Sequence, residues 1–137
     1  MSADDLTYDF GLPITLHFGA QNVAANADTH LIMPNGGAGL KVPSGYNFHP
    51  MLLHGEANAN PGAGNATFKV TANAVAVTVG PTVAIAAGTQ VGSTTQRPNV
   101  GSIAAGKIVG VDIVADANFA ANTIDMDVIL VGILLPA

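Results

Sequence analysis

The clearest pattern in the chain is an alternation of apolar and polar residues with a period of two. In segment 66–73 the apolar residues occupy the even positions and polar residues the odd ones. Because successive side chains of a strand point to opposite faces, this segment is predicted to be a β-strand with one buried face. From Val75 onward the large residues fall on odd positions, so we expect a turn or a bulge at Asn73 and Ala74.

Two further alternating segments lie near the C-terminus, at 107–115 and 123–135. Their apolar positions are predicted to face inward and their acidic positions outward. The inward set is Val109, Val111, Ile113, Ile124, Met126 and Val128, and the outward set is Asp112, Asp125 and Asp127. The polar link 116–122 is short, so we expect the two segments to form a hairpin.

Glycine and proline interrupt the rest of the chain at short intervals, and no segment keeps a helical apolar period for more than two turns. Further strands are expected at 14–18, 29–33, 46–54, 82–86 and 90–95, which together with the three segments above gives about eight. The fold class predicted is therefore all-β, an antiparallel two-sheet sandwich in the form of an eight-stranded jelly roll. An immunoglobulin-like sandwich is the main alternative, although the chain lacks the Cys, Trp and Cys of true immunoglobulin domains.

The N-terminal segment 1–12 is expected to be an extended arm, and residues 13–137 the sandwich domain. Leu6, Tyr8, Phe10 and Leu12 alternate along the arm. They could lay one apolar side on another protein by strand addition, or they could form an ordinary first strand of the sandwich. Both interpretations are open at this stage.

Composition points toward an assembled protein. Charged residues make up 9% of the chain, against about 25% in an average soluble domain, so much of the surface is expected to be an interface. With a net charge of −5 and four Lys and Arg residues, nucleic-acid binding is not expected. The acidic start has no secretory signal, and the apolar run 128–135 is too short for a membrane-spanning helix, so it is expected to be a buried strand.

The sequence offers no nucleophile in a catalytic context. It has no cysteine, and none of its four serines lies in a Gly-x-Ser-x-Gly motif. The glycine-rich segment 35–39 lacks the lysine that follows a phosphate-binding loop. We therefore expect no enzymatic activity and no cofactor.

Two groups of residues leave metal binding open. His49, His54 and Glu56 lie close together in one predicted strand and suggest a cupin-like metal enzyme, but their spacing puts the two histidines on opposite faces unless Pro50 introduces a bulge. Asp112, Asp125 and Asp127 are expected to share the outer face of the final hairpin. They could bind a calcium ion, yet no Asp-x-Asp-x-Asp-Gly loop accompanies them, and a solvated acidic face is favoured.

Four segments carry a family resemblance. They are 42–48 (VPSGYNF), 66–72 (ATFKVTA), 103–113 (IAAGKIVGVDI) and 124–132 (IDMDVILVG). Together they resemble small jelly-roll modules of bacteriophage virions, most closely the capsid decoration or cement proteins. The resemblance covers about the last hundred residues.

The resemblance implies a homotrimer, made in the host cytoplasm, that sits on the outer capsid surface, binds the major capsid protein and stabilises the shell. Phe18, Phe48 and Phe119 are candidates for subunit contacts, since aromatic residues gather at interface centres, although core packing is the simpler role for each alone. The alternative within the same resemblance is a receptor- or glycan-binding head of a phage fibre. The loops 35–39 and 58–65 would then carry the binding residues, but they lack aromatic side chains.

Overall fold

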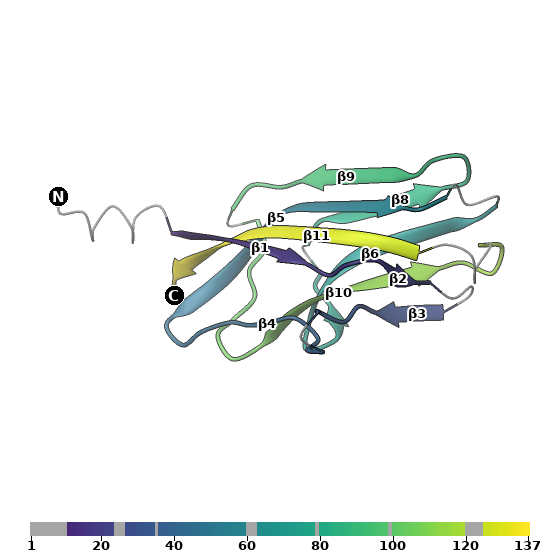
Figure 1. Ribbon diagram of the computed structural model, residues 1–137. Helices are drawn as coiled ribbons and strands as arrows, with labels where there is room; N and C mark the ends of the chain where they lie inside the picture. The colour runs from purple at the N-terminus through teal and green to yellow at the C-terminus, as the bar shows by residue number, and fades with distance from the viewer. Residues whose placement is uncertain are drawn as a thin grey trace.

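The computed structural model describes residues 11–23, 27–34, 36–59, 63–78, 80–98, 100–119 and 125–137, and its strands form two stacked antiparallel sheets (Figure 1). The described residues contain no helix. This confirms the all-β, two-sheet class. Among the same residues there is no helix long and apolar enough to span a membrane.

Sheet A has the order β1–β11–β5–β9, with β2 also paired to β11. Sheet B has the order β3–β10–β6–β7, with β4 also paired to β10 and β8 to β6. The bounds in chain order are β1 Leu12–His17, β2 Gln21–Asn22, β3 Ala27–His30, β4 Leu40–Lys41, β5 Tyr46–Ala57, β6 Asn65–Ala72, β7 Val75–Ala76, β8 Thr82–Ala86, β9 Val91–Thr95, β10 Ile108–Ala115 and β11 Asp125–Pro136.

Interruptions explain why these elements outnumber the strands expected from the sequence. β1 and β2 follow one another along the same edge of β11, and β3 and β4 do the same along β10. β7 and β8 likewise share β6 as their partner. Each pair is one line of chain broken by a loop, and the loop between β3 and β4 is the longest of these breaks among the described residues.

The expected hairpin of the last two strands is wrong. β10 lies in sheet B between β6 and the β3–β4 line, whereas β11 lies in sheet A between β1 and β5. The chain therefore crosses from one sheet to the other after Ala115. Alternation with a period of two shows which side of a strand is buried, and it carries no information on the strand's partner.

The expected turn after β6 is confirmed. Asn73 and Ala74 have φ angles of 50° and 64°, which are left-handed values, and β7 folds back antiparallel on β6. Left-handed values at both central residues are those of a type I′ hairpin turn. The turn is tied to β10 as well, since the Asn73 side chain accepts a hydrogen bond of 2.9 Å from the Ile108 amide.

The core lies between the sheets, and glycines make room for its aromatic rings. A Cβ on Gly55 of β5 would lie 1.6 Å from Cε2 of Phe68 in β6, so the Phe68 ring occupies the space above that glycine. Gly132 of β11 gives the Phe48 ring its space in the same way. Burial of a phenylalanine side chain contributes about 1.5–3 kcal/mol. The first contact joins sheet A to sheet B, and the second lies between neighbouring strands of sheet A.

Phe18, Phe48 and Phe119 all belong to this core, with exposed fractions of 2%, 0% and 3%. Their side chains are packed within one chain and offer no surface to a second subunit. The simpler role considered in the sequence analysis is the one observed. Of the arm residues, Leu6, Tyr8 and Phe10 lie outside the described residues, and Leu12 is the first residue of β1, opposite Leu134.

Candidate interaction surface

The outer face of sheet A carries an apolar stripe along β11. The even residues of this strand from Met126 to Leu134 point into the core, and the odd residues Ile129, Val131, Ile133 and Leu135 point away from it and are partly exposed. Register places Leu52 of β5 opposite Val131, and Pro13 of β1 opposite Ile133. We call these six outward residues, Pro13, Leu52, Ile129, Val131, Ile133 and Leu135, the apolar face.

The apolar face corrects one expectation from the sequence. The run 128–135 was expected to be a buried strand, whereas only its even residues pack in the core and its odd residues are partly exposed. None of the described residues covers the other side fully, so Ile129, Val131, Ile133 and Leu135 stay partly exposed. A sheet face of this kind, bare of charge at its centre, is unusual on an isolated soluble domain.

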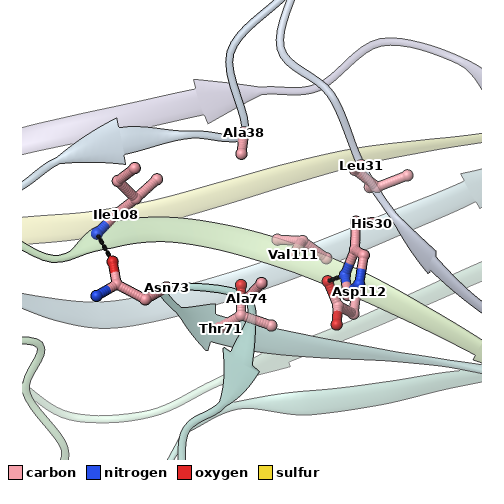
Figure 2. A pocket seen from close by; sticks show the side chains of 9 residues that line it. All are labelled: His30, Leu31, Ala38, Thr71, Asn73, Ala74, Ile108, Val111 and Asp112. Carbon is pink, nitrogen blue, oxygen red and sulfur yellow. Dashed lines mark hydrogen bonds and ion pairs between the residues drawn. The ribbon is translucent and has the colours of Figure 1, made fainter.

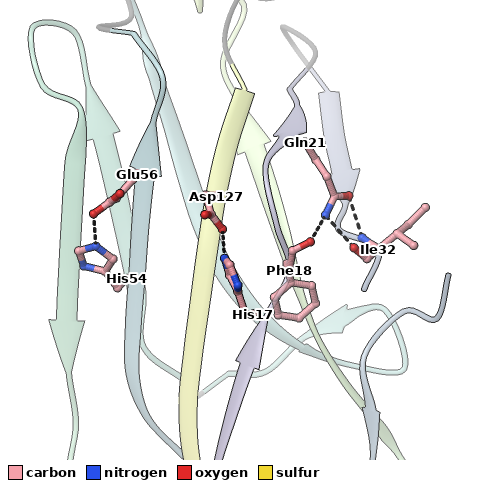
Figure 3. A network of polar contacts seen from close by, with 7 residues as sticks. All are labelled: His17, Phe18, Gln21, Ile32, His54, Glu56 and Asp127. Atoms are coloured by element: carbon pink, nitrogen blue, oxygen red, sulfur yellow. Dashed lines mark hydrogen bonds and ion pairs between the residues drawn. The ribbon is translucent and has the colours of Figure 1, made fainter. Parts of the chain in front are cut away.

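One end of the apolar face is polar, because two histidines pair there with two carboxylates (Figure 3). His17 Nε2 lies 2.7 Å from Asp127 Oδ1, and His54 Nε2 lies 3.0 Å from Glu56 Oε1. Asp127 and Glu56 are directly opposite in the register of β11 and β5. Like charges placed this way repel each other, so the flanking histidines are the groups that can offset the repulsion.

A bulge decides where His49 lies. Register shifts between Val131, which is opposite Leu52, and Gly132, which is opposite Pro50. The extra residue brings His49 and His54 onto the same outer face, on either side of the bulge. Within the described ranges, no three His, Asp or Glu side chains are grouped closely enough to hold a metal ion. The fold therefore does not bring His49, His54 and Glu56 close enough together to bind one metal ion.

The outer face of sheet B is more polar than that of sheet A, although Ile108 and Val114 of β10 also point outward. Its outward residues include Asp28 and His30 of β3, Lys69 of β6 and Asp112 of β10. His30 Nδ1 lies 2.6 Å from Asp112 Oδ1. This hydrogen bond, together with the negative charge of the Asp112 carboxylate, raises the pKa of His30 above its ordinary value of 6.5.

The expectation of one acidic face shared by three aspartates is wrong. Asp112 belongs to sheet B and is 8% exposed, whereas Asp125 and Asp127 belong to sheet A. Asp127 pairs with His17, and Asp125 lies 3.3 Å from the Asn22 side-chain amide. The error follows from the incorrect hairpin, because both strands were assigned to one sheet.

Sequence reasoning missed the apolar face as a site, although a signal for it was present. A strand that covers a core on one side needs apolar residues at alternate positions only. From Val128 to Leu135 the residues at both even and odd positions are apolar, except for Gly132. The additional apolar residues, which stand at the odd positions, are the ones that point outward.

The chain has little similarity to known proteins. No protein-family model and no curated protein matches the sequence. Among solved structures, the chain is similar to one described as the acidic stable capsid structure of Helicobacter pylori bacteriophage KHP30. The two share 13% sequence identity with a TM-score of 0.47, over 92% of this chain and 90% of that chain.

Proposed function

We propose that this chain is a structural protein of a bacteriophage particle, and that the apolar face of sheet A is its contact with a neighbouring subunit. The observation that carries the proposal is the outward stripe of Ile129, Val131, Ile133 and Leu135 on the central strand of the sheet. Apolar patches of this kind mark protein interfaces, because water contact with them costs free energy.

The dimensions of sheet A suit such a contact. β11 has twelve residues, so at about 3.3 Å per residue it is roughly 40 Å long. Four strands spaced about 4.8 Å apart span roughly 20 Å. The face therefore measures at most about 800 Å², which is the area that one partner buries in a standard interface. One such contact is large enough to join subunits when the whole face is covered.

The low charge of the chain supports the same proposal. Mixed surface charge normally keeps small domains apart, and this chain has charged residues at only 9% of its positions. Coverage by neighbours would remove that surface from solvent. Within an assembly of this kind the chain needs no chemistry of its own, and we propose that it is not an enzyme.

The finer part of the proposal concerns architecture and place. Counting each interrupted line once gives four strands in each sheet, in an order that we propose is an eight-stranded jelly roll. We propose further that the chain acts as a homotrimeric decoration protein on the outer capsid surface, where it binds the major capsid protein. Leu6, Tyr8 and Phe10 of the N-terminal arm would extend that contact.

Substitution of Val131 by lysine tests the apolar face. Val131 lies at the centre of the stripe, so a lysine there places a charge in the proposed contact while its stem can still reach solvent. Sedimentation velocity of the purified chain at rising concentration is expected to show self-association that Val131→Lys weakens by about 30-fold, the size of an interface hot spot.

Thr67→Lys is the matched control, since Thr67 points outward from a central strand of sheet B. It is expected to leave association within about twofold of the unsubstituted chain. Unfolding curves of both variants would show that the fold is retained. Equal association of all three proteins, or a monomer at every concentration both alone and with capsid shells, would contradict the proposed function.

A further inference from the structure

The outer face of sheet B contains a pocket that is separate from the apolar face of sheet A. It has a volume of about 340 Å³ and is lined by residues of β3, β6, β10, the loop after β3 and the turn after β6 (Figure 2). Its floor lies beside Gly110 of β10. A Cβ on Gly110 would lie 2.7 Å from the Ala38 carbonyl oxygen and 3.0 Å from Thr71 Oγ1, so the missing side chain lets the loop lie close over the strand.

Hydrogen bonds hold both walls of the pocket. On one side the Gln21 side chain of β2 bonds to the Ile32 carbonyl oxygen at 2.7 Å and to the Ile32 amide at 2.9 Å, which fixes the loop that carries Ala38 (Figure 3). On the other side Asn73 bonds to Ile108 through both its backbone amide and its side chain. The cavity is therefore formed before any ligand binds, as is usual for small-ligand sites.

The lining combines an apolar body with one polar end. Ala38, Ala74 and Ile108 supply most of the apolar surface, while Leu31 and Val111, each 1% exposed, border the pocket from the core side. In Figure 2 the His30–Asp112 pair lies at the opposite side of the pocket from the Asn73–Ile108 bond. Thr71, which is 2% exposed, adds a hydroxyl on the same floor.

Asp112 is the group that selects the ligand's charge. Its carboxylate is almost buried, with 11% of the side chain exposed, while its partner His30 is 58% exposed. A carboxylate can accept about four hydrogen bonds, and the bond from His30 uses one oxygen. A buried carboxylate is stabilised by each further donor that reaches it, above all by a cationic one.

We infer that this pocket binds a primary alkylammonium group, with its aliphatic chain against Ala38, Ala74 and Ile108 and its ammonium on Asp112. A lysine side chain of another protein and a free alkylamine share this chemistry. At about 30 Å³ per heavy atom the volume admits roughly ten atoms, more than a lysine side chain requires. The inference does not depend on the proposed function.

Binding of a cation at Asp112 competes with protonation of His30. The charged groups around the site are Asp28 and His30 on β3, Lys69 opposite Asp112 on β6, and Asp112 itself on β10. The affinity for alkylammonium is therefore expected to rise as the pH rises through the pKa of His30. Bound ligand is expected to lower that pKa in turn, because the two effects are linked.

Methyl NMR of the full chain with three probes of equal length tests the site. Pentylammonium is expected to shift the methyl signals of Leu31, Ala38, Ala74 and Ile108 in a saturable way. Pentanol is expected to bind about tenfold more weakly, which is the difference a charge-assisted hydrogen bond makes, and pentanoate to give no saturable shift. A blocked lysine amide as a fourth probe distinguishes the two sources: if it binds like pentylammonium, the site fits a protein's lysine, and if only the free amine binds, the site fits a small molecule.

Two variants and a matched control complete the test. Asp112→Asn is expected to lower pentylammonium affinity about tenfold, whereas Asp28→Asn, which removes the same charge from the same face outside the pocket, should change it less than twofold. Ala38→Leu fills the pocket with all charges kept and should abolish saturable binding. Equal affinities for the three probes, equal losses in the two aspartate variants, or no saturable shift in the unsubstituted chain would overturn the inference.

Discussion

The outer faces of sheets A and B rest on the same core and differ in what they present to solvent. On sheet A the central strand β11 turns Ile129, Val131 and Ile133 outward. On sheet B the central strand β10 turns Gly110 and Asp112 outward, and the loop that carries Ala38 lies close over Gly110. In both sheets successive side chains alternate between the core and the outer face. The fold therefore needs apolar residues only at the inward positions, on either side.

The comparison separates the requirements of folding from those of function. The inward residues of both sheets are apolar because the core requires it. No such requirement applies to the outward residues, and here the two sheets diverge. The apolar face of sheet A suits a large, dry contact, whereas the pocket of sheet B suits one small polar-ended group. The outward positions are therefore the ones to change when function is tested.

The largest expected effect comes from Gly55→Ala, which tests whether both faces rest on one core. The new Cβ would lie 1.6 Å from the Phe68 ring, which belongs to the other sheet. Overpacking of this kind is expected to lower the free energy of unfolding by about 3 kcal/mol, as measured by urea denaturation. Gly88→Ala is the control, since nothing lies within 4 Å of its Cβ and only its φ of +85° opposes the change, at about 1 kcal/mol. Equal losses would contradict the shared core.

A smaller effect, of opposite sign, is expected for Ala74→Gly at the rim of the sheet B pocket. Ala74 has a φ of 64°, a left-handed value that costs a residue with a Cβ about 1 kcal/mol. Glycine removes that cost, so the thermal midpoint should rise. Ala76→Gly, in the adjacent strand β7, has no such strain to lose and should lower the midpoint. A fall in both variants would show that the turn is not strained.

The smallest effect is expected for the pH dependence given by His30. Its pKa is raised by the hydrogen bond to Asp112 and by the charge of that carboxylate. A raised folded pKa means that the pair stabilises the fold fully below about pH 6.5, and that this contribution is lost as the pH rises through the folded pKa. Urea denaturation of the unsubstituted chain and of His30→Gln should therefore converge above that pKa and diverge below it. Parallel curves over the whole range would exclude the contribution.

Most single strands could be predicted from the sequence, because each one needs only its own residues. The expected segment 82–86 is β8 as observed, and the turn at Asn73 follows from the parity change. β3 begins earlier than expected, since Ala27 and Asp28 pair with β10 without any apolar signal. Pairing could not be predicted for β10 and β11, because partner choice depends on the whole chain.

The candidate sites could be predicted only in part. The outward direction of Asp112, Asp125 and Asp127 was correct, but their grouping was not, because it depended on the hairpin. The pocket could not be predicted, since it arises where the loop carrying Ala38 meets Gly110, residues about seventy positions apart in the sequence. The apolar face could have been predicted, because the run 128–135 has apolar residues at both even and odd positions.

Hydroxyl-radical footprinting of the protein at low concentration and in its assembled form tests the central claim most directly. We expect assembly to protect Leu52, Ile129, Val131, Ile133 and Leu135 on sheet A, while Lys69 and Thr67 on sheet B remain as reactive as in the dilute protein. Protection confined to sheet B, or no change in reactivity of the apolar face when the particle forms, would contradict the account.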